Sequence, residues 1–333
     1  MSFPAARAVP ARALLDVQAP VRALLDEVPR EMWRIVAADN ALAANVTDHL
    51  MAMRGKMFRP TLVLLAAAAD EPPPRRAVTL AAITELVHLA TLVHDDSVDH
   101  SALRRGQPTV NSLFSHQVSV IMGDLLYVHA FAELVRDADF QVLGAVTRAS
   151  TEMTVGEIQQ LAAIDALAFS EQDYEQLIRA KTASLFSAAC EIGAIAGGGR
   201  HREAMARYGD RLGRAFQIAD DLLDYTEDAE TTGKPHGLDL REHKVTLPLI
   251  AALRQMSAAE RARVEALFAE EQPGDEQIAE VTAIVAENGG LDYARRRGER
   301  YAQDAEEALA GLPAGPVRSA LTDAIAYVLD RRS

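Results

Sequence analysis

The chain has 333 residues, of which 49% are hydrophobic and 25% are charged, a balance typical of a soluble globular protein with a sizeable core. Its net charge of -14 argues against a nucleic-acid partner, because a face that binds phosphates directly is normally basic. The single cysteine, Cys190, excludes an intramolecular disulfide. The longest uninterrupted apolar run, residues 61–69, is shorter than the ~20 residues of a membrane helix, and no signal-peptide pattern is present. We therefore expect a cytoplasmic protein without stable membrane insertion.

Helical patterns follow one another along the chain. Residues 1–30 are expected to form an N-terminal capping segment. Residues 78–94 carry apolar side chains at nearly every third or fourth position, and residues 118–135 are apolar almost all round, as in a central buried helix. Clusters of Gly and Pro predict loops at 71–76, 104–109, 196–201, 231–237, 270–275, 287–290 and 311–316. Because no strand alternation, repeat or low-complexity linker interrupts this pattern, we predict a single all-α domain over residues 1–333.

Two acidic stretches share one pattern, "LVHDDSVD" at residues 92–99 and "QIADDLLD" at residues 217–224. In a helix, residues i and i+4 lie about 40° apart around the axis, so the first and last aspartates of each stretch share a face that the middle one borders. Carboxylates near a core are costly without a counter-charge, and hard divalent cations are the natural candidates. A solvated helix end is the alternative for either stretch alone. The candidate metal ligands are Asp95, Asp96, Asp99, Asp220, Asp221 and Asp224.

Basic side chains accompany both acidic stretches. Magnesium binds through one or two carboxylates together with substrate phosphates, while arginine and lysine contact phosphate oxygens directly. We therefore predict a metal-bridged diphosphate held between two facing helices. The basic residues placed to assist are Lys56, Arg59, Arg104, Arg105, Lys181, Lys234 and Lys244.

The ordered set of motifs resembles the trans-isoprenyl diphosphate synthase family over about residues 50–250, with a weaker match in the C-terminal helices. The segments that carry the resemblance are "GKMFRP", "ELVHLATLVHDD", "HDDSVDHSALRRGQPTVN", "GDLLYVHAF", "GEIQQL", "AKTASLF" and "FQIADDLLDYTEDAETTGKPHGLDLREHKVTLPLI". Four residues depart from the usual pattern. Met57 and Phe58 stand where the family often has a basic or polar residue and then leucine. His100 replaces an acidic or small residue, and His243 replaces a glycine.

The resemblance implies the isoprenoid synthase fold, with antiparallel helices around a central deep cavity and the two aspartate motifs facing each other across its mouth. It also implies three Mg²⁺ ions, bound by the six aspartates named above. The allylic diphosphate is expected to contact Arg104, Lys181, Lys234 and Lys244. Isopentenyl diphosphate is expected to contact Lys56, Arg59, His88 and Arg105. Thr182 and Gln217 are expected to line the site of the reacting carbon, so the catalytic set is Asp95, Asp96, Lys181, Thr182, Gln217 and Asp220.

The implied reaction is head-to-tail (1'-4) condensation of isopentenyl diphosphate with an allylic prenyl diphosphate, giving an all-trans product. Small residues one helical turn before Asp95, namely Ala90 and Thr91, leave room for a growing chain, and Phe131 is a candidate floor of the cavity. A long, octaprenyl-like product is therefore favoured. The alternatives are a geranylgeranyl or farnesyl diphosphate synthase and a non-catalytic subunit of a heteromeric synthase. The family also implies a homodimer.

Rival classes fit the motifs less well. A class I terpene cyclase shares an all-α fold and a magnesium–diphosphate site, but it normally has one aspartate motif and a differing second metal motif. A di-iron carboxylate bundle requires two Glu-x-x-His segments, and only residues 85–88 fit that pattern.

Overall fold

The computed structural model describes residues 14–37, 40–53, 55–104, 106–162, 166–226 and 237–330. These residues are almost entirely helical, which confirms the all-α class. The only strands among them, β1 (Leu103–Arg104) and β2 (Gln107–Pro108), form a short antiparallel hairpin inside the predicted loop at 104–109. The first half of the chain contains α1 (Leu14–Gln18), η1 (Ala19–Val21), α2 (Arg22–Leu25), α3 (Val28–Val36), α4 (Ala41–Ala52), α5 (Phe58–Ala67), α6 (Arg76–Val98), α7 (Val110–Leu113), α8 (His116–Asp137) and α9 (Phe140–Ala162).

The second half continues in the same way. Its elements are η2 (Ala166–Ala168), α10 (Glu171–Ile178), the π-helical turn η3 (Arg179–Ala183), α11 (Ser184–Ala196), α12 (Arg202–Thr226), α14 (Leu238–Arg241), α15 (Leu247–Leu253), α16 (Ala258–Ala269), α17 (Asp275–Glu287), α18 (Gly290–Ala308) and α19 (Pro316–Leu329).

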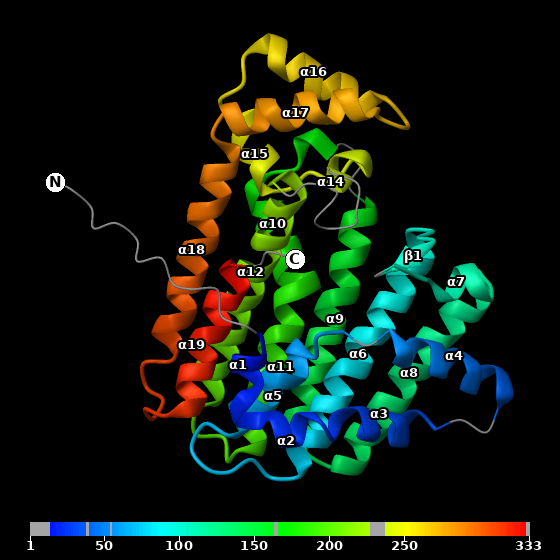
Figure 1. The fold of residues 1–333 in the computed structure, drawn as a ribbon, viewed down its shortest axis with the longest axis vertical. Helices are drawn as coiled ribbons and strands as arrows, with labels where there is room; N and C mark the ends of the chain where they lie inside the picture. Colours follow the sequence, from blue (N-terminus) through cyan, green and yellow to red (C-terminus); the bar gives the residue numbers. More distant parts are fainter. Residues whose placement is uncertain are drawn as a thin grey trace.

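The long helices run roughly along the long axis of the molecule (Figure 1). Helix α12 packs against α11 and α18, α11 against α5 and α9, and α6 against α8. The hairpin of α16 and α17 lies across one end, while α2 and α3 lie across the other (Figure 1). The buried apolar side chains of the described residues form one continuous core. The C-terminal ends of α6, α9 and α12 point toward the end that carries β1 and α14, so the ends of three central helices meet there (Figure 1).

The N-terminal helices cover the outside of the central bundle. Helix α1 packs against α19, and η1 contacts both α19 and α5. The side-chain amide of Gln18 donates to the carbonyl of Lys56 at 3.0 Å, which joins this segment to the chain just before α5. The capping role of residues 1–30 stays a prediction, and residues 1–13 fall outside the described part.

Helix α8 is not the fully buried helix that its sequence predicted. The side chains of Ile121, Val128 and Val135 are 64%, 64% and 65% exposed, and Phe140 at the start of α9 is 85% exposed. By length and composition alone, both α6 and α8 could cross a membrane, but the apolar stretch of α6 is 67% buried within the fold and that of α8 is 39% buried. The sequence-based expectation considered only uninterrupted apolar runs and did not detect this exposed face of α8.

Candidate active site

The first aspartate motif ends α6. Asp95 is half-buried, and burial followed by the nearby charge of Glu157 raises the pKa of its carboxyl to about 6, although Lys181 and Arg104 oppose the rise. These four residues come from α6, α9, η3 and β1. The structure therefore brings Lys181 and Arg104, two predicted diphosphate contacts, to the same carboxylate.

The second residue of this motif, Asp96, is buried and already has a cationic partner. The Nε of Arg104 donates to both carboxylate oxygens at 2.8 Å, and its Nη2 lies 2.8 Å from one of them. Asp99 follows at the C-cap of α6, and its side chain is exposed. Because Asp96 lies inside and Asp99 outside, the three aspartates differ in how much water reaches them.

The second aspartate motif lies in the last turns of α12. Asp221 is 5% exposed, and it accepts hydrogen bonds from the Tyr174 hydroxyl at 2.5 Å and from the side-chain amide of Gln217 at 2.8 Å. Burial raises the pKa of Asp221 to about 7 because it outweighs these two hydrogen bonds, and the charges of Asp220 and Asp224 add to the rise. Both hydrogen-bond donors are neutral, so they orient the carboxylate without supplying a positive charge.

Asp224 joins α12 to the segment that follows the second motif. Its two carboxylate oxygens accept hydrogen bonds from the backbone N–H groups of Leu238 and Asp239, each at 3.0 Å. Carboxylates at a helix N-terminus are favourable partners for such N–H groups. This contact holds α14 against the end of α12.

A further acid, Asp239, belongs to this cluster and was not among the predicted site residues. Burial, and then the charges of Asp221 and Asp224, raise the pKa of Asp239 to about 8. The sequence signal for it was weak, since it is a single aspartate five residues before Lys244 in "GLDLREHK". Its importance becomes visible only when α14 is placed beside α12.

Lys181 and Thr182 lie in a π-helical turn, η3, between α10 and α11. Lys181 Nζ lies 2.6 Å from both Glu157 Oε1 and Gln160 Oε1 on α9. Thr182 Oγ1 donates to Gln217 Oε1 at 2.7 Å, and Gln217 in turn donates to Asp221. Single π-turns inside helices are frequent at functional sites. This turn connects the surroundings of the first motif with those of the second.

Two glycines allow neighbouring helices to approach this turn. A Cβ at Gly156 on α9 would lie 2.9 Å from Ala180 Cβ and 3.2 Å from Lys181 Cγ. A Cβ at Gly213 on α12 would lie 2.6 Å from Ala183 Cα. The turn is thus held tightly between α9 and α12.

Lys244 relates the two motifs electrostatically. Burial alone would lower the pKa of Lys244, but the hydrogen bond and charge of Glu242 and the charges of Asp99 and Asp239 raise it. Asp99 belongs to the first motif, and Asp239 lies beside the second. The ammonium group of Lys244 therefore interacts electrostatically with one carboxylate of the first motif and with one beside the second.

Three of the residues that depart from the family pattern adopt left-handed backbone conformations. Met57, His100 and His243 have φ values of 54°, 50° and 53°. Each is next in the chain to a predicted site residue, namely Lys56, Asp99 or Lys244. Residues with a Cβ rarely adopt this left-handed backbone conformation, whereas glycine adopts it readily. A glycine would therefore suit the position of His243.

Three of the residues predicted to hold isopentenyl diphosphate, Lys56, Arg59 and His88, lie on or just before α5 and on α6. His88, Asp96 and Arg104 line a cavity with about 540 Å³ of empty space, open solvent at its mouth included. Lys56, at the exposed end of the loop before α5, and Arg59, whose guanidinium lies 4.7 Å from the centre of the Phe186 ring, are not among its lining residues. The remaining walls are mostly apolar and rich in methionine: Met32, Leu50, Met51, Met53, Gly55, Met57, Glu85, Leu89, Leu92 and Val93.

The residues predicted to limit product length lie on other faces of α6 and α8. Ala90 is fully buried, whereas Thr91 is half-buried and donates its hydroxyl to the carbonyl of His88 at 2.7 Å. The Phe131 ring lies 6.2 Å from Tyr127, measured between ring centres, and Tyr127 stacks with His94. Neither Ala90, Thr91 nor Phe131 lines the cavity described above. Their role in product length stays a prediction.

Two predicted substrate contacts, Arg105 and Lys234, lie outside the described residues. The other predicted positions are all described. The two aspartate motifs lie in the last turns of α6 and α12, and the C-terminal ends of these two helices point toward the same end of the bundle (Figure 1).

The donor set of this site fits magnesium. Carboxylate oxygens are its preferred protein ligands, and burial is the largest cause of the raised pKa values of Asp95 and Asp221, so their ionised forms gain from a nearby cation. Within the described ranges, no three carboxylates or imidazoles are gathered closely enough to hold an ion by themselves.

The comparisons with known proteins match most of the chain. The sequence profile described as "Polyprenyl synthetase" matches residues 40–285. An all-trans-nonaprenyl-diphosphate synthase (geranyl-diphosphate specific) of Rhodobacter capsulatus is 40% identical, with 95% of this chain and 97% of that protein covered. The octaprenyl diphosphate synthase of Haemophilus influenzae is 37% identical, with 92% and 94% covered.

The fold comparison agrees with these sequence matches. The crystal structure of a polyprenyl synthase from Caulobacter crescentus, complexed with calcium and isoprenyl diphosphate, superimposes with a TM-score of 0.90 at 34% identity, covering 98% of this chain and all of that one. The family profile spans most of the chain, and the relatives span nearly all of it. The chain belongs to the polyprenyl synthetase family.

Proposed function

We propose that this protein is a trans-polyprenyl diphosphate synthase that condenses isopentenyl diphosphate head-to-tail with an allylic prenyl diphosphate and makes a long all-trans product. The carrying observation is the position of the π-turn η3 between the motifs: the charge of Lys181 acts on the Asp95 carboxyl, and the next residue, Thr182, donates to Gln217, which donates to Asp221. The long-chain relatives favour a product of that class over the geranylgeranyl, farnesyl and non-catalytic alternatives.

In this proposal, the chain's own residues bind the leaving diphosphate and orient the reacting carbon. Arg104, Lys181 and Lys244 face its negative charge, and Thr182 with Gln217 lies beside the carbon from which it departs. When bound, magnesium neutralises the developing charge on the diphosphate, which is the largest contribution expected for such a reaction. The apolar cavity walls keep water away from the allylic cation before the double bond of isopentenyl diphosphate attacks it.

The assignment of metal ligands follows the same argument. We assign the ions, three per site with diphosphate bound, to the six aspartates of the two motifs. Asp239 is a neighbouring carboxyl whose own pKa is raised by burial and by the charges of Asp221 and Asp224. The calcium and isoprenyl diphosphate in the Caulobacter crescentus structure support a divalent cation together with a diphosphate.

The exposed apolar face of α8 supports a homodimer. Ile121, Val128 and Val135 recur every seven residues, so they form one stripe along the helix, and Phe140 continues it onto α9. An exposed patch of this kind marks an interaction surface, and a second copy accounts for it without an additional protein. The matched variants Ile121→Glu and Val128→Glu are expected to convert the dimer into monomers in size-exclusion chromatography with light scattering.

A single-domain, cytoplasmic protein completes the proposal. The continuous core of the described residues supports one domain. The largely buried apolar stretch of α6 and the dimer proposed for α8 explain both membrane-length helices without a membrane.

One assay tests the reaction and the product class together. The purified protein is incubated with Mg²⁺, labelled isopentenyl diphosphate and, separately, geranyl, farnesyl or geranylgeranyl diphosphate, and the products are sized by chromatography after dephosphorylation. We expect long-chain products that require the metal. Each condensation adds ~5 carbons. Products that stop at farnesyl or geranylgeranyl length at all substrate ratios would therefore establish one of the short-chain alternatives. A complete lack of incorporation would favour the non-catalytic subunit.

A further inference from the structure

Residues on one face of α12 contact α10 and η3, the segment that carries Lys181 and Thr182. Asp210, Arg214, Gln217 and Asp221 are spaced by four, three and four residues, which puts them on one helix face. Each of them contacts α10 or η3. Asp221 and Gln217 bind Tyr174 and Thr182 within the site, while Arg214 and Asp210 bind Glu175 and Arg179 one and two turns away.

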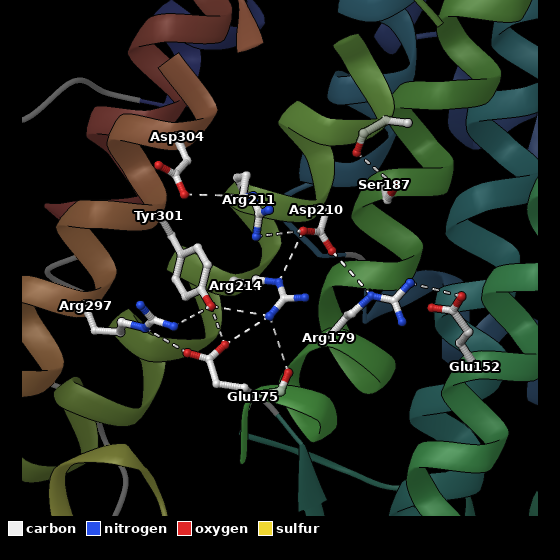
Figure 2. Close-up of polar contacts among 11 residues, drawn as sticks. Glu152, Glu175, Arg179, Ser187, Asp210, Arg211, Arg214, Arg297, Tyr301 and Asp304 are labelled. Carbon is white, nitrogen blue, oxygen red and sulfur yellow. Dashed lines mark hydrogen bonds and ion pairs between the residues drawn. The ribbon is translucent and has the colours of Figure 1, made fainter. Parts of the chain in front are cut away.

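Glu175 is the centre of the distant part of this face (Figure 2). Its Oε2 lies 3.0 Å from Arg214 Nη1, its Oε1 lies 2.8 Å from Arg297 Nε, and it accepts a hydrogen bond from the Tyr301 hydroxyl. The Glu175 and Arg214 side chains are only 15% and 12% exposed. The guanidiniums of Arg214 and Arg297 also lie 5.4 and 4.9 Å from the centre of the Tyr301 ring. The last turn of α10 is therefore fixed to α12 and α18 at once.

Asp210 fixes the start of the π-turn (Figure 2). Its carboxylate lies 3.2 Å from Arg214 Nε, 3.4 Å from Arg211 Nη1 and 3.9 Å from Arg179 Nε. Arg179 is the first residue of η3, and it also reaches Glu152 on α9 at 3.4 Å. Glu175 and Arg179 thus hold the chain immediately before the point where the helical spacing changes.

This arrangement matters because π-turns are uncommon conformations that persist only where the surrounding structure maintains them. A buried ion pair contributes little net stability, since desolvation offsets much of the attraction, but it constrains geometry strongly. We propose that Glu175, through Arg214 and Tyr301, is a positioning residue that sets the register of the π-turn and thereby aims Lys181 and Thr182. This inference rests on the diphosphate and reacting-carbon roles proposed for those two residues.

The test compares two glutamates with similar surroundings. Glu191 on α11 is 9% exposed and, like Glu175, contacts two arginines, Arg148 and Arg202, both at 2.7 Å. Its ion pairs belong to a different part of the bundle. The variants Glu175→Gln and Glu191→Gln are compared for thermal unfolding midpoint, kcat, and KM for each substrate.

We expect both variants to lose similar stability, but only Glu175→Gln to lose turnover, by about tenfold to a hundredfold as for a misplaced catalytic group. KM for isopentenyl diphosphate should stay unchanged, because Lys56, Arg59 and His88 lie on other elements. Normal kcat in a folded Glu175→Gln protein, or equal losses of kcat in both variants, would overturn the proposal. If Glu175→Gln fails to fold, Tyr301→Phe removes only one donor to Glu175, and unchanged kcat there would overturn it equally.

A separate variant distinguishes failure of this inference from failure of the proposed site. Lys181→Ala should abolish most activity if Lys181 contacts the diphosphate. An inactive Lys181→Ala protein with a fully active Glu175→Gln protein would refute the positioning role alone. A fully active Lys181→Ala protein would refute the site assignment and the positioning role that depends on it.

Discussion

The two aspartate motifs have the same spacing in the sequence but different surroundings in the fold. In the first, the buried carboxylate is Asp96, and the guanidinium of Arg104 contacts both of its oxygens at 2.8 Å. In the second, the buried carboxylate is Asp221, whose two hydrogen-bond donors, Tyr174 and Gln217, are neutral. An identical pattern therefore gives the two buried carboxylates different partners, a guanidinium at Asp96 and two neutral donors at Asp221, where burial raises the pKa to about 7.

This difference indicates a division of labour between the motifs. A carboxylate paired with arginine has its charge partly compensated before any metal or diphosphate binds. A carboxylate oriented by neutral groups gains most from an added cation, because nothing positive among its two donors offsets its burial. The second cluster, with Asp239 beside it, should therefore depend more strongly on magnesium than the first.

The largest effect is expected from removing one leading aspartate of either motif. Asp95→Ala and Asp220→Ala should each lower kcat by about 10²–10³-fold or more, because each removes charge that holds the metal against the leaving group. Steady-state kinetics measure the loss, and circular dichroism should show an unchanged helical content. If the second motif depends more strongly on magnesium than the first, the Mg²⁺ concentration needed for half-maximal rate rises more for Asp220→Ala than for Asp95→Ala. Activity close to that of the unaltered protein in either variant would contradict the assigned roles.

A smaller loss is expected from crowding the π-turn between the motifs. Gly156→Ala adds a Cβ 2.9 Å from Ala180 Cβ and 3.2 Å from Lys181 Cγ, so the turn must shift by several tenths of an ångström. We expect kcat to fall by roughly tenfold. Gly144→Ala is the matched control, because it lies on the same helix and its Cβ would meet no atom within 4 Å. Both changes favour helix formation equally, so equal kinetics in the two variants would show that the turn tolerates displacement.

The sequence predicted the parts of the candidate site that consist of repeated local patterns. Asp95, Asp96, Asp220 and Asp221 were proposed from spacing, since a helix converts spacing into a shared face. Asp239 and Tyr174 could not, because their proximity to the second motif depends on how α14 and α10 pack against α12.

The exposed stripe on α8 was missed for a related reason. An apolar helix in the centre of a domain and one that faces a partner have the same composition, so only packing reveals which side is covered. The π-turn was also invisible, because "RAKTASLF" reads as an ordinary helix, whereas the close packing of Gly156 and Gly213 against the turn appears only in the fold.

The smallest expected effect concerns stability, and it tests the contrast in charge directly. The pKa values of Asp221 and Asp239 are raised from 3.8 to about 7 and about 8, so the folded protein keeps protons that the unfolded chain releases. The contribution of these two carboxyls to the free energy of unfolding is fully present below their pKa in the unfolded chain. It is lost as the pH rises through their pKa values in the folded protein. The metal-free protein should therefore melt at a lower temperature near pH 8 than near pH 5, by a few degrees. Carboxylates with lowered pKa values, such as Asp139, titrate below this window.

Two controls test whether this decline of melting temperature with pH comes from the second motif. Asp239→Asn removes one titrating group and should flatten the decline in melting temperature, while Asp16→Asn, on α1 far from the site, should leave it unchanged. Mg²⁺ with inorganic pyrophosphate favours the charged carboxylates, so its stabilising effect should be greater at the higher pH. If the melting temperature of Asp239→Asn declines with pH as steeply as that of the unaltered protein, the proposed difference in charge between the two motifs is wrong. The same holds if Mg²⁺ with pyrophosphate stabilises the protein equally at both pH values.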